Sequence, residues 1–126
     1  WFLKKLGAFP VKRGTADLSA IKHSLKVLSE DKVFGIFPEG TRNKTGGIRA
    51  FSHGVAAIAH KSKAQTVPVA IIGKYKIFRP ICIKIGKPLD FSEYYLKKSS
   101  TEVLENMSLE MEQTIKNLIN NSTDVA

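Results

Sequence analysis

The sequence predicts an α/β domain with a mostly parallel central sheet and flanking helices. Apolar runs at residues 33–37, 65–72 and 80–85 have the length and composition of buried strands. Helical spacing of apolar residues occurs at residues 17–29 and 99–118. Because residues 17–29 separate the extended run 8–11 from the run 33–37, they indicate a βαβ crossover, right-handed if its strands are parallel.

The length of 126 residues, with 43% apolar and 25% charged residues, predicts a single globular domain over residues 1–126. The sequence opens on Trp1 within a continuing pattern, so we expect an N-terminally truncated fragment. No apolar run reaches 18 residues, and no signal peptide is recognisable, so we expect no bilayer crossing.

The formal charge of +9 is unevenly distributed. Residues 1–88 carry a net charge of +13, and residues 89–126 carry −4. The basic part favours an anionic partner, which on charge alone is nucleic acid, anionic lipid or a phosphorylated substrate; the alternative is a solvated lysine-rich surface. The single cysteine, Cys82, is interpreted as a small buried apolar residue with no disulfide or metal partner, which favours a reducing compartment.

The N-terminal third is predicted from local signals. Residues 1–6 mix large apolar side chains with two lysines, so they form either a membrane-interface segment or the end of a core helix that Gly7 caps. Residues 8–11 form an edge strand or an extended segment, since a proline interrupts them. Asp17 caps a helix that runs to about Ser29. Its apolar face comprises Leu18, Ile21, Leu25 and Leu28, and His23 faces solvent.

The remaining elements follow similar patterns. Residues 55–60 predict a helix with small side chains, and residues 65–72 and 80–85 predict strands. Ser99 and Glu102 have the spacing of a capping box, which begins a C-terminal amphipathic helix over residues 99–120. Its apolar stripe is Leu104, Met107, Met111, Ile115 and Leu118, which is interpreted as packing.

The predicted strand 33–37 ends at a proline, and the polar residues after it are candidates for binding phosphate. Gly40 lets the backbone approach a ligand, Thr41 offers a hydroxyl, and Arg42 offers a rigid five-donor fork. Ligands of α/β proteins bind at the ends of parallel strands, so Glu39 and its neighbours would lie in a site. The alternative is an ordinary surface turn.

Residues 37–42, Phe-Pro-Glu-Gly-Thr-Arg, resemble the third sequence block of the glycerolipid acyltransferases, the family that includes 1-acylglycerol-3-phosphate acyltransferase. Residues 7–13 are similar to the second motif of that family, in which the final arginine, here Arg13, is associated with the substrate phosphate. Lys12 stands where that motif often has an acid. Phe51 and Gly54 also match the spacing that follows the third motif.

Val67, Pro68 and Val69 resemble the fourth motif, an apolar strand linked weakly to the acyl-donor side of the site. The resemblance extends from about residue 7 to residue 89. It implies a domain like that of the glycerol-phosphate acyltransferases. It also implies transfer of a fatty acyl group from acyl-CoA or acyl-ACP, as co-substrate, to 1-acylglycerol-3-phosphate in phospholipid biosynthesis. No other cofactor and no metal are implied.

In the implied site, Arg13 and Arg42 hold the acceptor phosphate, with help from Gly40 and Thr41. Glu39 is assigned to an acceptor hydroxyl or to ordering the loop, because two anions repel each other.

The catalytic base of this family is a histidine followed, five residues later, by an aspartate. His23, His53 and His60 are followed at that distance by Leu28, Ile58 and Gln65. The base pair is therefore expected upstream of Trp1 or is absent from the native product. His53 lies near the motif, but its place at a helix start favours a structural role. We expect these 126 residues to bind the acceptor without catalysing transfer, and acyl transfer by them alone would refute this.

The expected partners are a lysophospholipid acceptor, an acyl thioester donor and an anionic membrane surface, with the protein peripheral on the cytoplasmic side of the membrane. One alternative is a basic nucleic-acid module; the aromatic residues are spread singly and form no stacking platform, so no nucleic acid is expected. Another is a non-catalytic relative that binds anionic membranes through its basic face.

Overall fold

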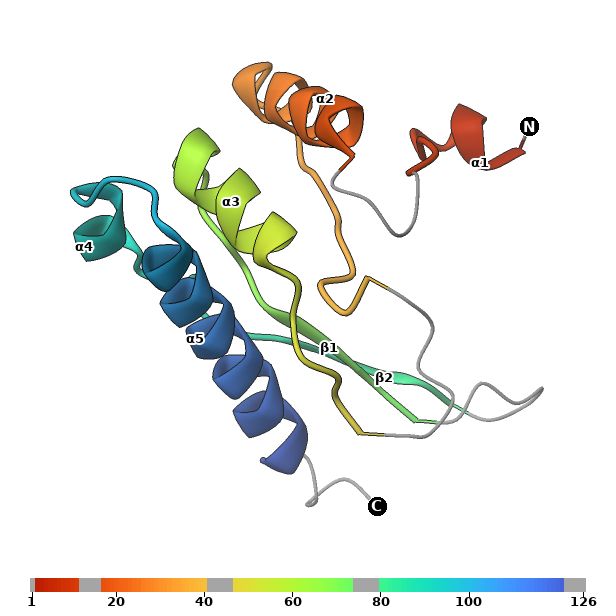
Figure 1. Cartoon of the computed structure of the whole chain (residues 1–126). Helices are drawn as coiled ribbons and strands as arrows, with labels where there is room; N and C mark the ends of the chain where they lie inside the picture. Colours follow the sequence, from red (N-terminus) through yellow and green to blue (C-terminus); the bar gives the residue numbers. More distant parts are fainter. Residues whose placement is uncertain (1, 12–16, 41–46, 74–79, 122–126) are drawn as a thin grey trace. The chain divides into compact units, whose positions relative to one another are not determined.

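The computed structural model describes residues 2–11, 17–40, 47–73 and 80–121. The chain divides into two compact units, Trp1–Ile36 and Phe37–Ala126, and each is described by itself. Figure 1 shows their elements, which are helices and short strands. This mixture of helices and strands agrees with the predicted α/β class. The organisation of residues 1–126 as a single domain remains a prediction.

The first unit contains α1 (Phe2–Lys5) and α2 (Leu18–Ser29). Gly7 ends α1 as predicted, because its φ of +86° suits glycine and its N–H donates to the carbonyl oxygen of Lys4 at 3.1 Å. No helix of the described residues is both long and apolar enough to cross a membrane.

Asp17 caps α2, as predicted. Its Oδ1 accepts hydrogen bonds from the N–H groups of Ser19 and Ala20, both at 3.1 Å. The fully buried residue of this helix is Ser24, whose hydroxyl donates to Ala20 O at 2.8 Å, whereas Leu18 at the start of the predicted apolar face is exposed. Sequence spacing therefore identified the helix better than it identified the buried side chains.

Residues 33–37 are not a buried strand, which corrects the prediction. Val33 is 97% exposed, and residues 33–37 have no strand assignment. A strand is stable only where a neighbouring strand accepts and donates backbone hydrogen bonds, and the described residues provide none for this run. Phe34 instead stacks on Phe9, with ring centroids 6.0 Å apart.

Residues 8–11 have no strand assignment, so the first of the two predicted possibilities, an edge strand, is wrong for these residues. The ring of Phe9 also lies edge-on to His23, with centroids 4.3 Å apart. His23 is exposed, as predicted, but it contributes to this small aromatic cluster.

The second unit contains α3 (His53–Ser62), β1 (Val69–Ile72), β2 (Cys82–Ile85), α4 (Ser92–Tyr95) and α5 (Thr101–Asn120). α3 packs against α5, and α5 packs against β1 (Figure 1). The core of this unit gathers side chains from both helices and from the segments before α3 and α4. It consists of Phe51, Val55, Ala56, Ala59, Phe91, Val103, Met107 and Met111.

The sheet of the described residues is an antiparallel pair, with Val69 opposite Ile85 and Ile72 opposite Cys82. The link between the two strands is shorter than the dozen or more residues that a parallel crossover needs, so the antiparallel arrangement follows from the chain itself. The larger, mostly parallel sheet remains a prediction. Cys82 is half-buried rather than buried as predicted.

The two faces of this sheet differ. Ala70 is 2% exposed on the face that α5 covers. Strand pairing places Val69, Ile71, Ile83 and Ile85 together on the opposite face, where all four are exposed. We refer to these four residues as the apolar sheet face.

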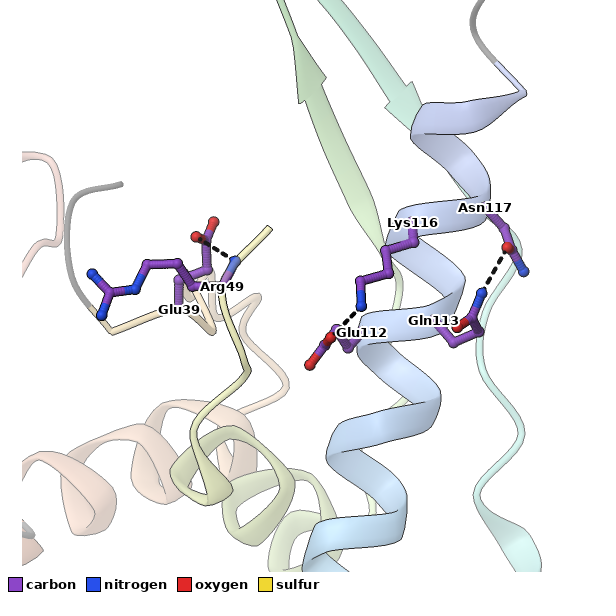
Figure 2. A network of polar contacts seen from close by, with 6 residues as sticks. All are labelled: Glu39, Arg49, Glu112, Gln113, Lys116 and Asn117. Carbon is purple, nitrogen blue, oxygen red and sulfur yellow. Dashed lines mark hydrogen bonds and ion pairs between the residues drawn. The ribbon is translucent and has the colours of Figure 1, made fainter. Parts of the chain in front are cut away.

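The helix α5 begins one residue later than predicted. Its N-cap is Ser100 rather than Ser99, because Ser100 has extended backbone angles and its Oγ accepts the N–H of Val103 at 3.3 Å. Met107 and Met111 of the predicted stripe are buried. Farther along α5, the partly buried Glu112 pairs with Lys116 at 2.5 Å, and Figure 2 shows the two side chains.

Met107 is fully buried between α3 and α5, whereas Leu109, on the same helix, is 56% exposed. We expect Met107→Ala to lower the free energy of unfolding by about 2–5 kcal/mol, because it removes apolar contacts and leaves a cavity. Leu109→Ala is the matched control, with an expected change within roughly 0.5 kcal/mol. Urea denaturation of both variants measures the difference, and equal effects would contradict the described core.

Gly86 is crowded by its neighbours. Its N–H donates to the carbonyl oxygen of Pro68 at 2.9 Å. A Cβ at this position would lie 2.9 Å from both Pro68 Cγ and Leu118 Cδ1. The leucine can rotate away, but the proline ring cannot.

We therefore expect Gly86→Ala to destabilise the fold by about 1–3 kcal/mol through overpacking. Gly35→Ala is the control, since a Cβ there meets no atom within 4 Å and its φ is not positive. Thermal unfolding of the two variants distinguishes crowding from a general cost of replacing glycine. A stable Gly86→Ala variant would show that Pro68 and Leu118 do not pack as described.

Candidate phosphate-binding site

The predicted phosphate corner begins with a turn at residues 37–40. The N–H of Gly40 donates to the carbonyl oxygen of Phe37 at 3.2 Å. Gly40 has a φ of +66°, in the left-handed region that favours glycine, and the space where a Cβ would lie is open. A backbone angle rather than crowding therefore requires this glycine.

Two hydrogen bonds join this turn to the segment before α3. Oε2 of Glu39 accepts the backbone N–H of Arg49 at 3.1 Å, as Figure 2 shows. The N–H of Ser52 donates to the carbonyl oxygen of Pro38 at 2.9 Å. We call these four residues, Pro38, Glu39, Arg49 and Ser52, the loop stem. In the sequence, Thr41 and Arg42 lie between the two halves of the stem.

The loop stem is anchored in the core through α3. Phe51, directly before Ser52, is 9% exposed and packs in the core with Val55 of the first helical turn. The bond from Ser52 to Pro38 places the start of α3 beside the turn. A helix N-terminus carries partial positive charge and unpaired N–H groups, a suitable environment for an anion nearby.

The structure describes only part of the predicted set of phosphate ligands. Arg13, Thr41 and Arg42 lie outside the described residues, as does Lys12. Gly40 and Glu39 lie in the turn and the loop stem. The joint binding of phosphate by the two arginines therefore remains a prediction.

The three residues predicted near the acyl donor have different surroundings. Pro68 is buried, and its carbonyl oxygen accepts the N–H of Gly86. Val67 is 44% exposed, and Val69 belongs to the apolar sheet face. Pro68 thus has a structural role in packing, and contact with a donor remains a prediction.

The histidines of the second unit differ in their surroundings. His53 is exposed at the first residue of α3. Nε2 of His60 lies 3.1 Å from the carbonyl oxygens of both Tyr94 and Lys97, so this nitrogen carries the proton and donates. His60 therefore ties α3 to the end of α4. Burial, reinforced by the charge of Glu110, raises the pKa of the Tyr94 hydroxyl in the same region.

Arg49 is the residue of this region that sequence reasoning underused. No role was assigned to Arg49 from the sequence, whereas the structure places its backbone in the loop stem. Its contact with Glu39 spans ten positions, which no helical or strand period reveals. The residues between Glu39 and Arg49, which include the pair Gly46 and Gly47, carry no sequence pattern that predicts this contact.

The first unit has a separate open hollow of about 200 Å³, lined by Leu3, Lys4, Ala8, Phe9 and Pro10. Its lining is mainly apolar.

Comparison with known proteins places the turn and the loop stem in a known family. Residues 1–72, more than half of the chain, match the family model described as Acyltransferase. The chain therefore belongs to the acyltransferase family.

Two bacterial relatives named 1-acyl-sn-glycerol-3-phosphate acyltransferase are similar to this chain. The Bacillus subtilis protein is 38% identical over 94% of this chain and 61% of its own length. The Streptococcus pneumoniae protein is 32% identical over 86% of this chain and 41% of its own length. The Arabidopsis thaliana chloroplast protein of the same name, LPAT1, is 30% identical over 61% of this chain and 22% of its own length. This chain thus spans less than two thirds of these relatives. No solved structure gives a significant match.

Proposed function

We propose that this chain forms the acceptor-binding part of an O-acyltransferase of phospholipid biosynthesis. The reaction transfers a fatty acyl group to 1-acylglycerol-3-phosphate and gives phosphatidate. The observation that carries the proposal is the family match over residues 1–72, together with relatives named for this reaction at 38% and 32% identity. The turn at Gly40 and the hydrogen bonds of the loop stem support the proposal, because they lie at the motif that suggested phosphate binding.

In the proposed mechanism, Arg13 and Arg42 hold the acceptor phosphate, Gly40 lets the backbone approach it, and Thr41 contributes its hydroxyl. Charge-assisted hydrogen bonds of about 1.5–3 kcal/mol each make either arginine costly to lose. The family's histidine and aspartate pair, which residues 1–126 do not contain, would remove the proton of the acceptor hydroxyl. The hydroxyl oxygen then attacks the thioester carbonyl of acyl-CoA or acyl-ACP, and the thiolate leaves.

The apolar sheet face supports the predicted fold of the whole domain. Four exposed β-branched side chains on one face of β1 and β2 are typical of a sheet that further elements cover. We propose that β1 and β2 are part of a larger, mostly parallel sheet with helices on both faces. Val67, which is exposed and precedes β1, then remains available to the donor side of the site.

The exposed side chains around α1 support a membrane partner. Phe2, Leu3 and Leu6 are each about two-thirds exposed, and Lys4 and Lys5 lie between them in the sequence. Apolar side chains with adjacent cations suit the interface of an anionic bilayer. We propose that this segment holds the protein peripherally on the cytoplasmic side of the membrane, where its lipid acceptor resides.

We expect Arg42→Ala to weaken binding of 1-oleoylglycerol 3-phosphate by roughly ten- to a hundred-fold, since it removes a charge-assisted contact. Arg13→Ala should act similarly. Binding of palmitoyl-CoA should change little. Isothermal titration in detergent micelles measures both ligands.

Lys61→Ala is the control for this experiment, because it removes the same charge from an exposed position at the end of α3. Equal losses for acceptor and donor, or equal losses in the control, would contradict the phosphate assignment. No acceptor binding by the unaltered chain would refute the proposed function itself.

We expect the double variant Phe2→Ser, Leu3→Ser to reduce binding to vesicles of phosphatidylglycerol and phosphatidylcholine at least several-fold, because it removes two exposed apolar side chains. Leu109→Ser, an exposed leucine of α5, is the matched control. Vesicle sedimentation measures the bound fraction. Unchanged binding of the double variant would show that α1 is not the contact.

A further inference from the structure

The contact between Glu39 and Arg49 differs in kind from the other contact of the loop stem. The bond from Ser52 to Pro38 joins main chain to main chain, so it is independent of the side chains at those positions. The bond at 3.1 Å from Arg49 N to Glu39 Oε2 depends on the side chain at position 39 and only on the backbone at position 49. Residue 39 is therefore the position at which side-chain chemistry controls the stem.

We propose that Glu39 is a positioning residue for the acceptor site: its carboxylate closes the loop stem through the backbone of Arg49 and does not touch the acceptor. This inference rests on the proposed function. It decides between the two roles that the sequence left open for Glu39, an acceptor hydroxyl and the order of the loop.

The chemistry of a carboxylate suits this role. An ionised oxygen forms a stronger bond to a backbone N–H than a neutral acceptor does. Glu39 is half-buried and the side chain of Arg49 is exposed, and the bond between Glu39 and the Arg49 backbone lies at an exposed position. A carboxylate that instead met the acceptor directly would lie close to a phosphate and repel it.

The place of the bond in the chain makes it effective. Thr41 and Arg42 follow Glu39 by two and three residues, so a fixed residue 39 sets where the loop starts. Arg49 fixes the other end, beside the segment that Ser52 and Phe51 anchor to the core. Binding groups displaced by even about 1 Å lose much of their effect.

The test compares Glu39→Gln with Glu39→Ala. The glutamine keeps an oxygen that can accept the Arg49 N–H, and the alanine removes it. We expect Glu39→Ala to weaken binding of 1-oleoylglycerol 3-phosphate about tenfold or more, and Glu39→Gln to weaken it no more than about threefold. The amide hydrogen exchange of Arg49, followed by NMR, should accelerate in Glu39→Ala and change little in Glu39→Gln.

Arg49→Ala controls the exchange measurement, because it removes the guanidinium but keeps the backbone N–H. Protection of that amide should persist in the variant. Global unfolding, monitored by urea denaturation, separates loss of the stem from loss of the fold.

Three outcomes overturn the proposal. Glu39→Gln could lose acceptor affinity as fully as Glu39→Ala while the Arg49 amide stays protected; Glu39 would then act on the acceptor through its charge, and the proposed function would stand. An Arg49 amide that exchanges equally in the unaltered chain and in Glu39→Ala would show that the bond does not hold the stem. Absence of acceptor binding by the unaltered chain would refute the proposed function, and the stem would have no ligand to position.

Discussion

Apolar packing of α3 against α5 is the interaction on which the rest of the second unit depends. Met107 is fully buried in it, and Val55 and Phe51 extend it to the first turn of α3. The residue after Phe51, Ser52, donates its N–H to the carbonyl oxygen of Pro38, so a single residue connects the core to the phosphate motif. A change in the core at Phe51 is therefore connected to the turn at residues 37–40 through Ser52.

Local signals in the sequence predicted local structure well. Asp17 and Gly7 were identified as caps because the carboxylate of Asp17 and the positive φ of Gly7 both act within a few residues. The stripe of α5 was identified because a helix repeats every 3.6 residues, and burial of Met107 and Met111 follows from that period. Even the error at the start of α5 was one residue, since two adjacent serines offer the same cap.

Features that depend on distant partners were predicted poorly. Residues 33–37 have strand composition, but a strand also needs a neighbour, which composition does not supply. For the site, the sequence identified Gly40 and Glu39 as members of a motif by resemblance to the family. It left the role of Glu39 open, because the partner is a backbone N–H ten residues away and any residue except proline provides one.

The apolar sheet face has a practical consequence for handling the protein. The two short strands expose an apolar surface made of Val69, Ile71, Ile83 and Ile85. Four residue pairs hold the strands in register. Such surfaces promote self-association of a polypeptide at high concentration. Purification of these residues alone therefore calls for dilute solutions and mild detergent, and aggregates formed without them would reflect this face rather than misfolding of the helical core.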